Sequence, residues 1–187
     1  MFSTTFVRRA PLLAALLALV ALFAPPAAHA QACANVDLKP TRANLELVRA
    51  AVLCLHNAER ARHGLPRLIE NPRLRRAAAR HTLHMVAAHF FDHTTPVGST
   101  MVDRIRRTGY TSHTRGWSIG ENIAWGTGRL ATAAQINRSW MNSPGHRANI
   151  LQRAFREIGI GIETGVPVRL SAAQTGATYT ADFGVRR

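Results

Sequence analysis

The chain has 187 residues and a formal net charge of +14 at pH 7, from 24 Lys and Arg against 10 Asp and Glu. This length fits one domain with one core, and no internal repeat or long linker indicates a second. Arginine supplies almost all of the positive charge, which favours anionic surfaces such as phospholipid head groups, although a solvated arginine-rich surface is the plainer explanation. We expect no nucleic-acid partner, because no nucleic-acid-binding motif occurs.

Residues 1–30 have the pattern of a cleaved secretory signal peptide. Arg8 and Arg9 precede an apolar core, residues 12–23, that is too short for a good membrane span. An Ala-His-Ala sequence then ends at Ala30, where we place cleavage. The short core disfavours the alternative of an uncleaved anchor. We therefore expect a secreted or periplasmic protein with no transmembrane segment after cleavage, whose net charge falls to +12 because two arginines leave.

Residues 31–40 form an N-terminal tail that contains one of the two cysteines, Cys33, and the other is Cys54. Export to an oxidising compartment favours a disulfide between them. Closing a loop of about twenty residues would stabilise the fold by about 3 kcal/mol. Two unpaired thiols and a lipid-anchored Cys33 remain alternatives, and Gln31 fits a lipoprotein signal badly.

The main domain, residues 41–187, begins with an expected helix over 41–63, which Thr41 or Asn44 caps and Gly64 ends in the left-handed conformation. Its apolar residues recur at the three-and-four spacing of one buried face.

This helix contains His56, Asn57 and Arg60. Either His56 is a ligand, or the three side chains form a buried polar network that fixes a loop. We prefer the network.

A second helix opens with Asn71 as the cap and Pro72 in the first turn. Its expected inner face consists of Leu74, Ala78, His81, Met85 and Ala88, and a basic face consists of Arg73, Arg76 and Arg80. The basic face could meet an anionic surface. The scattered histidines of this helix more often pack or face solvent than bind metal.

Shorter elements follow. We expect a helix over 99–108, a loop over 110–118, a helix that starts at a Thr132–Gln135 capping box, and a helical turn over 146–151. The period then changes to that of strands over 158–162, 166–170 and 179–185, with the first two forming a hairpin. Glycines at alternate positions of 158–162 indicate a close neighbour. Helices first and strands late predict an α+β fold with a small antiparallel sheet between helices.

Three ionisable residues are the candidates for one polar site: His93, Glu121 and His146. Glu121 and His146 each stand beside a glycine and shortly before an apolar run, which predicts tightly turned backbone rather than a long helix face. The helices and strands would then form the scaffold that carries these loops.

The chain resembles the CAP superfamily of cysteine-rich secretory, antigen 5 and pathogenesis-related proteins, in its short bacterial branch with an SCP-like extracellular domain. The matching motifs, in family order, are His56-Asn57-x-x-Arg60, Gly64-Leu65-Pro66, Asp92-His93-x-x-Pro96, Gly120-Glu121-Asn122-Ile123-Ala124, Trp140, Ser143-Pro144-Gly145-His146-Arg147-Ala148-Asn149-Ile150, Ile158-Gly159-Ile160-Gly161 and Phe183-Gly184. Together they cover nearly all of residues 45–185.

The resemblance implies a three-layer α-β-α sandwich and a surface cavity lined by two His and two acidic residues. By position, these are His93, His146 and Glu121, and Ser143 stands where many members have the second acid. Two imidazoles and one carboxylate are a standard ligand set for zinc or another divalent cation, with a fourth position open. Asn122, Ser143 and Asp92 would support this groove, and Asp92 is the nearest candidate to orient His93 or act as a base.

We interpret the chain as a secreted, non-enzymatic CAP-domain binding protein with a groove for a divalent metal and for a lipid, sterol or cell-envelope ligand. One alternative is a metal-dependent, peptidase-like hydrolase that acts on peptide or envelope material, in which the open metal position holds water. The other is a cationic interaction module for anionic surfaces. No Gly-x-Ser-x-Gly elbow or catalytic cysteine occurs, and we expect Ser143, before Pro144, to be a cap or turn residue rather than a nucleophile.

Overall fold

The computed structural model describes residues 32–169 and 175–187. The predicted signal peptide and its cleavage after Ala30 lie outside this part, so they stay predictions. Within the described ranges, no helix is long and apolar enough to span a bilayer. The elements are α1 (Leu45–Arg62), β1 (Ile69–Glu70), α2 (Pro72–Ala88), α3 (Met101–Arg107), β2 (Trp117–Thr127), the 3-10 turn η1 (Gly128–Ala131), α4 (Ala133–Asn142), α5 (Pro144–Ile150), β3 (Glu157–Thr164) and β4 (Gly176–Arg186).

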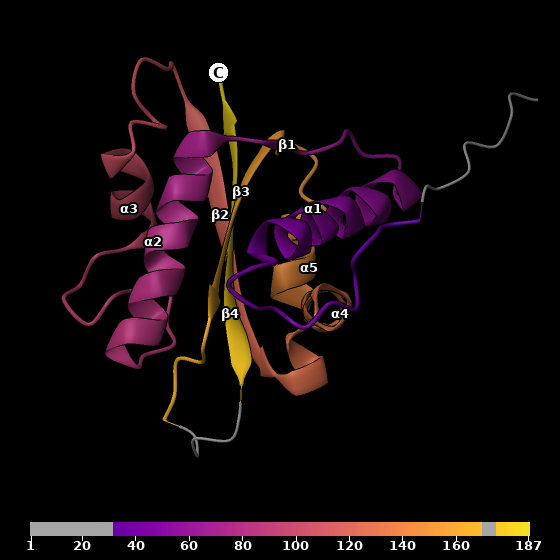
Figure 1. Ribbon diagram of the computed structural model, residues 1–187. Coiled ribbons are helices and arrows are strands. Elements are labelled where there is room, and N and C mark those ends of the chain that lie inside the picture. Colours follow the sequence, from indigo (N-terminus) through magenta and orange to yellow (C-terminus); the bar gives the residue numbers. More distant parts are fainter. Residues whose placement is uncertain (1–31, 170–174) are drawn as a thin grey trace, which may run out of the picture. The chain divides into compact units, whose positions relative to one another are not determined.

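The four strands form one sheet in the order β1-β3-β4-β2, in which β4 pairs antiparallel with both of its neighbours. Helices α2 and α3 cover one face of the sheet, and α1, α4 and α5 cover the other (Figure 1). The expected α+β fold with an α-β-α sandwich is therefore confirmed. The sheet is antiparallel except at β1, a two-residue strand that pairs parallel with β3.

The glycines of β3 let α2 lie directly on the sheet. A Cβ atom at Gly159 would lie 1.9 Å from the backbone nitrogen of Arg75, and one at Gly161 would lie 2.5 Å from the backbone of Ala78. The close neighbour that the alternating glycines predicted is thus the backbone of α2.

The disulfide between Cys33 and Cys54 forms, with 5.7 Å between the two Cα atoms. It ties the N-terminal tail to α1, as expected from the sequence. Because it closes a loop across 21 residues of sequence separation, it reduces the conformational freedom of the unfolded chain.

The polar residues of α1 hold the loops around it. Arg60 has no exposed surface and donates hydrogen bonds of 2.7 to 3.0 Å to four backbone carbonyls, those of Pro66, Ile150, Gln152 and Phe155.

Asn57 and His56 precede Arg60 by three and four residues in α1. Asn57 accepts from the backbone nitrogen of Leu68 and donates to the carbonyl of the same residue. His56 is buried between the rings of Trp140 and Phe183, and burial lowers its pKa to about 4. The neutral His56 packs as part of the core.

Several expected helix details need correction. The first helix begins at Leu45 rather than at residue 41, and Ala88 at the end of α2 is exposed rather than inward. Asn71 caps α2 as predicted, since its side chain accepts from the next turn of backbone. The capping box at Thr132 is wrong, because that side chain is turned into the core, where its hydroxyl is buried without a partner among the described residues. A capping box does form at Thr100 with Asp103.

The strands differ more from expectation. Trp117 and Ser118, the last residues of the expected loop over 110–118, instead begin the long strand β2, for which we had predicted no strand. The predicted strand over 166–170 is wrong for its described residues, 166–169, which are not strand, and Leu170 lies outside the described part. Gly165, at φ +115°, turns the chain after β3, and Pro167 lacks the N–H that a ladder needs. The antiparallel partner of β3 is β4 instead.

Candidate functional site

The site is built around the middle of β2, where Glu121 and Asn122 follow one another. Glu121 is 6% exposed and lies within a continuous ladder opposite Asp182 of β4, so the expected turned backbone is wrong for it. The need for glycine at position 120 has another explanation. A Cβ atom at Gly120 would lie 2.8 Å from the side chain of Asn149 in α5, so the glycine admits a packed helix rather than a turn.

Glu121 binds two basic side chains with its two carboxylate oxygens. Oε1 lies 2.8 Å from Nδ1 of His93, and Oε2 accepts a 2.6 Å hydrogen bond from Nη2 of Arg104. Burial raises the pKa of Glu121, but the hydrogen bond from His93 and the charge of Arg104 outweigh burial and lower it. Glu121 is therefore an ionised carboxylate with both oxygens engaged.

His93 lies in the loop between α2 and α3, with about half of its side chain exposed. The bond to Glu121 raises the pKa of His93 against the opposing effect of burial. The Nδ1 atom of His93 faces the carboxylate. Its other ring nitrogen, Nε2, has no hydrogen-bond partner among the described residues. Arg104 fixes the loop itself by donating to the carbonyl of His93 at 2.8 Å.

His146 approaches β2 from α5, where it lies in the first turn. Its Nδ1 lies 2.9 Å from Oγ of Ser143, and its carbonyl accepts a 2.9 Å bond from the side chain of Asn122. Burial and then the positive charge of His93 lower the pKa of His146. Asn122 is held in turn by Asn149, which donates to Oδ1 of Asn122 at 2.9 Å.

Asp92 makes no hydrogen bond to the His93 ring within the described residues, and its Oδ1 accepts instead from the backbone nitrogen of Thr94 at 2.6 Å. The carboxylate that orients His93 is Glu121, whereas Asp92 shapes the loop and its carbonyl bonds to His81. Ser143 is the N-cap residue of α5, but its side chain makes no capping hydrogen bond and bonds instead to Nδ1 of His146.

Two charged residues of the site had no role in the sequence analysis. Arg104 is 6% exposed and connects Glu121 to the loop of His93. Asp182 is fully buried opposite Glu121, and burial, then the charge of Glu121, raises its pKa well above the usual range. A lone acid in the apolar run 179–185 was a usable signal for Asp182. Nothing distinguished Arg104 from the other arginines of this chain.

The arrangement brings His93 and His146 to the same strand from opposite sides. Side chains of neighbouring strand residues point to opposite faces, so Glu121 meets His93 on one side of β2 and Asn122 meets His146 on the other. β2 is an edge strand of the sheet, and it contacts His93 through Glu121 and the backbone carbonyl of His146 through Asn122. However, no three His, Cys, Asp or Glu side chains in the described part are grouped so as to hold a metal ion. The candidate ligands for a cation are therefore the imidazoles of His93 and His146, because both oxygens of Glu121 already bond to His93 and Arg104.

The sequence and the fold were compared with those of known proteins. The model of the cysteine-rich secretory protein family, CAP, matches residues 53–169. The chain belongs to this family. Its CAP domain is 36% identical over 115 residues to the protein YkwD of Bacillus subtilis (strain 168), a match that covers 61% of this chain and 42% of that protein. A membrane protein of the same organism, YlbC, is 28% identical over 112 residues, covering 60% of this chain and 30% of its own.

Solved structures show the same CAP architecture. An extracellular protein with an SCP domain from Bacillus anthracis superposes with a TM-score of 0.57 at 25% identity, over 80% of this chain and 45% of that one. An outer surface protein of Borrelia burgdorferi shares the fold alone, with a TM-score of 0.56 at 16% identity over 77% of this chain and 96% of that one. The chain spans less than half the length of the Bacillus relatives it matches, and these likenesses confirm the bacterial CAP assignment.

Proposed function

We propose that this protein is an exported, non-enzymatic CAP-domain binding protein that holds a divalent cation such as zinc at His93 and His146 and binds a lipidic or cell-envelope ligand. The contact between Nδ1 of His93 and Glu121 carries the proposal. A metal-binding histidine usually donates its second nitrogen to a carboxylate, which fixes the ring and makes the ligating nitrogen more basic. Glu121 is then the orienting partner of His93 and not a ligand.

Several observations support export and binding rather than catalysis. The signal-like residues 1–30, the disulfide, and the extracellular SCP-domain relative support export. Glu121 is a poor general base, because Arg104 and His93 hold both of its oxygens and lower its pKa. A bound cation would supply electrostatic attraction for an anionic group of a ligand.

Zinc titration by calorimetry tests the metal site, with chelator-treated wild-type protein and His146→Ala. We expect one binding site that is lost in His146→Ala. Glu121→Gln should weaken the site by about 10- to 100-fold, the usual effect of removing an orienting partner. His113→Asn is the matched control, since His113 is exposed, lies outside the site, and has a left-handed φ of +56° that Asn tolerates. Equal binding heats in wild type and His146→Ala would refute the site.

The hydrolase alternative makes a different prediction. Turnover of peptide or envelope material that stops with a chelator and returns with zinc would favour it, whereas zinc binding without turnover would exclude it. The contact between Ser143 and His146 does not supply a serine hydrolase, since no carboxylate orients His146 among the described residues.

A further inference from the structure

The end of the sheet at which β2 begins and β4 ends has a row of alternating arginine and aromatic side chains (Figure 1). Trp117 is 37% exposed, and the guanidinium carbon of Arg106 lies 5.9 Å from the centre of its ring. Arg186 is the cross-strand partner of Trp117, so the two side chains lie on the same face of the sheet. Arg186 lies in turn 4.9 Å from the ring centre of Tyr110, and its charge is paired with Glu157 at 2.8 Å.

Two arginines beside the exposed Trp117 ring have no acid partner. Arg106 is exposed and makes no hydrogen bond or ion pair with another described side chain, and the acid of its own helix, Asp103, is held in the capping box at the helix start. Arg115 is also exposed, and its backbone nitrogen donates to the carbonyl of Arg187 at 2.7 Å. This bond holds Arg115 two residues before the indole ring, while its guanidinium has no partner among the described residues.

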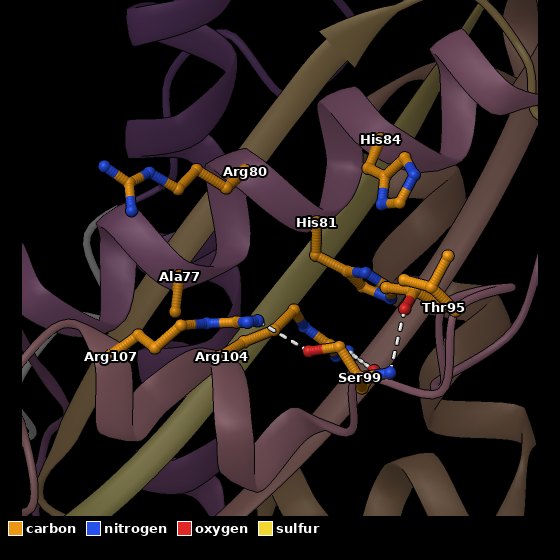
Figure 2. Close-up of a pocket in the computed structure, with 9 residues that line it drawn as sticks. Ala77, Arg80, His81, His84, Thr95, Ser99, Arg104 and Arg107 are labelled. Carbon is orange, nitrogen blue, oxygen red and sulfur yellow. Dashed lines mark hydrogen bonds between the residues drawn. The ribbon is translucent and has the colours of Figure 1, made fainter.

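The other arginines of α3 face a different part of the molecule. Figure 2 shows Arg104 and Arg107 beside Ser99, at a pocket of about 280 Å³ between α2, α3 and the loop over 95–99. Nη1 of Arg104 donates to the Ser99 carbonyl at 3.1 Å, and Nη2 of Arg107 donates to the Ser99 hydroxyl at 2.5 Å. Those two arginines hold a loop. Arg106 lies over Trp117 instead, so holding that loop does not explain it.

Tryptophan beside unpaired arginine is a combination typical of binding surfaces, because these residue types are enriched at binding hot spots. The flat, largely apolar face of an indole ring packs against the C–H face of a sugar ring. A guanidinium binds a carboxylate through two parallel hydrogen bonds. The combination therefore complements a polymer whose sugar rings have carboxylates. Such a polymer fits better than a nucleic acid, because the sequence has no nucleic-acid-binding motif and the proposed export leads to the cell envelope.

We propose that Arg106, Trp117 and Arg115 form a binding surface for an acidic polysaccharide. One sugar ring stacks on the exposed part of Trp117, and carboxylates of the same chain pair with the two arginines. This inference names the cell-envelope ligand of the function proposed above and rests on that function for its role. The surface is separate from the proposed metal site, since Trp117 precedes Glu121 by four residues of β2, about 13 Å along the strand.

Titration with oligogalacturonate, a chain of galacturonate sugars, tests the surface by calorimetry and tryptophan fluorescence. Removal of one charge-assisted hydrogen bond should weaken binding about tenfold, so we expect that effect for Arg106→Gln and for Arg115→Gln. The matched control is Arg138→Gln, which removes the same charge from an exposed position of α4, on the opposite face of the sheet. It should change affinity less than about twofold. Equal losses in Arg138→Gln and Arg106→Gln would show attraction to net charge only and would overturn the proposal.

Two substitutions at Trp117 test the stacking. Trp117→Phe keeps an aromatic ring and should keep affinity within about threefold. Trp117→Thr keeps a residue suited to a strand but removes the ring, and it should weaken binding about tenfold while the circular dichroism spectrum stays that of the folded protein. Unchanged affinity in Trp117→Thr would contradict the proposal.

Two further probes define the chemical class of the ligand. Methyl-esterified oligogalacturonate keeps the sugar rings but lacks the negative charges, so it should bind at least tenfold more weakly than the acid. Equal binding of the ester would refute pairing with the arginines. Single-stranded DNA that binds as tightly as oligogalacturonate, with the same loss in Trp117→Thr, would assign the surface to nucleic acid and refute the proposal.

The metal site and this surface are tested independently. His146→Ala should keep oligogalacturonate binding, and Trp117→Thr should keep zinc binding. If zinc fails to bind while oligogalacturonate binds with the expected losses, the metal proposal fails alone. If zinc binds and oligogalacturonate does not, this inference fails alone.

Discussion

Replacement of Arg60 by alanine should destabilise the protein more than any surface substitution, because Arg60 donates to four carbonyls, two of them in buried hydrogen bonds and two in part-buried ones. A buried acceptor left without a donor costs about 1–3 kcal/mol, and water entry into the vacated space offsets part of the sum. We expect a loss of about 4 kcal/mol, from the two buried acceptors at about 2 kcal/mol each. For a domain of this size, that corresponds to a fall in Tm of about 8–16 °C.

The assay is thermal and urea unfolding followed by circular dichroism, under non-reducing conditions that keep the disulfide. Arg60→Lys should recover part of the loss, because an ammonium group keeps the charge but cannot reach four carbonyls at once. Arg62→Ala is the control, since Arg62 is 65% exposed and pairs only with Glu59 in the same helix. Such a surface pair contributes about 0–1 kcal/mol. A Tm for Arg60→Ala within about 2 °C of that for Arg62→Ala would refute the assigned role.

Two further predictions concern the core. Gly159→Ala should destabilise the protein by about 3 kcal/mol or more in the urea assay, because the new methyl group would lie 1.9 Å from the α2 backbone. Gly116→Ala is the control and should be nearly neutral, since no atom lies within 4 Å of the methyl group it adds. The folded pKa of His56 is about 4, below its ordinary value of 6.5, so the unfolded chain binds a proton first as the pH falls. Stability should therefore drop between pH 6.5 and 4 by about 3 kcal/mol from this residue, and His56→Leu should flatten that slope; an unchanged slope would contradict the burial of a neutral His56.

The helices could be predicted from the sequence because their signals are local. Asn71 and Pro72 mark a helix start through contacts within one turn, and the structure confirms it. The capping box at Thr132 failed because that side chain turned into the core, a tertiary effect that no local pattern shows.

The strands and the site depend on distant neighbours, which limits what the sequence shows. Apolar residues occupy every second position from Trp117 to Trp125, as in a strand, except that the buried Glu121 occupies one of these positions. Gly120, next to it, resembled a turn residue. Both features make sense only beside α5 and Arg104. His93, Glu121 and His146 were singled out by their local sequence and again by the family motifs, while the buried role of Arg104 follows from its position in the fold.

The order of the strands has a consequence for when the sheet can form. β4 is the final strand of the chain, yet it lies between β2 and β3 and supplies the ladder for both. Until residues 176–186 arrive, β2 lacks its partner in the described sheet, and the pairs between β2 and β4 span 49 to 69 residues of sequence. Such non-local pairing is slow because loop closure precedes any gain from the contacts. An emerging chain therefore keeps its sheet incomplete, with β2 and β3 not yet joined, until residues 176–186 are available.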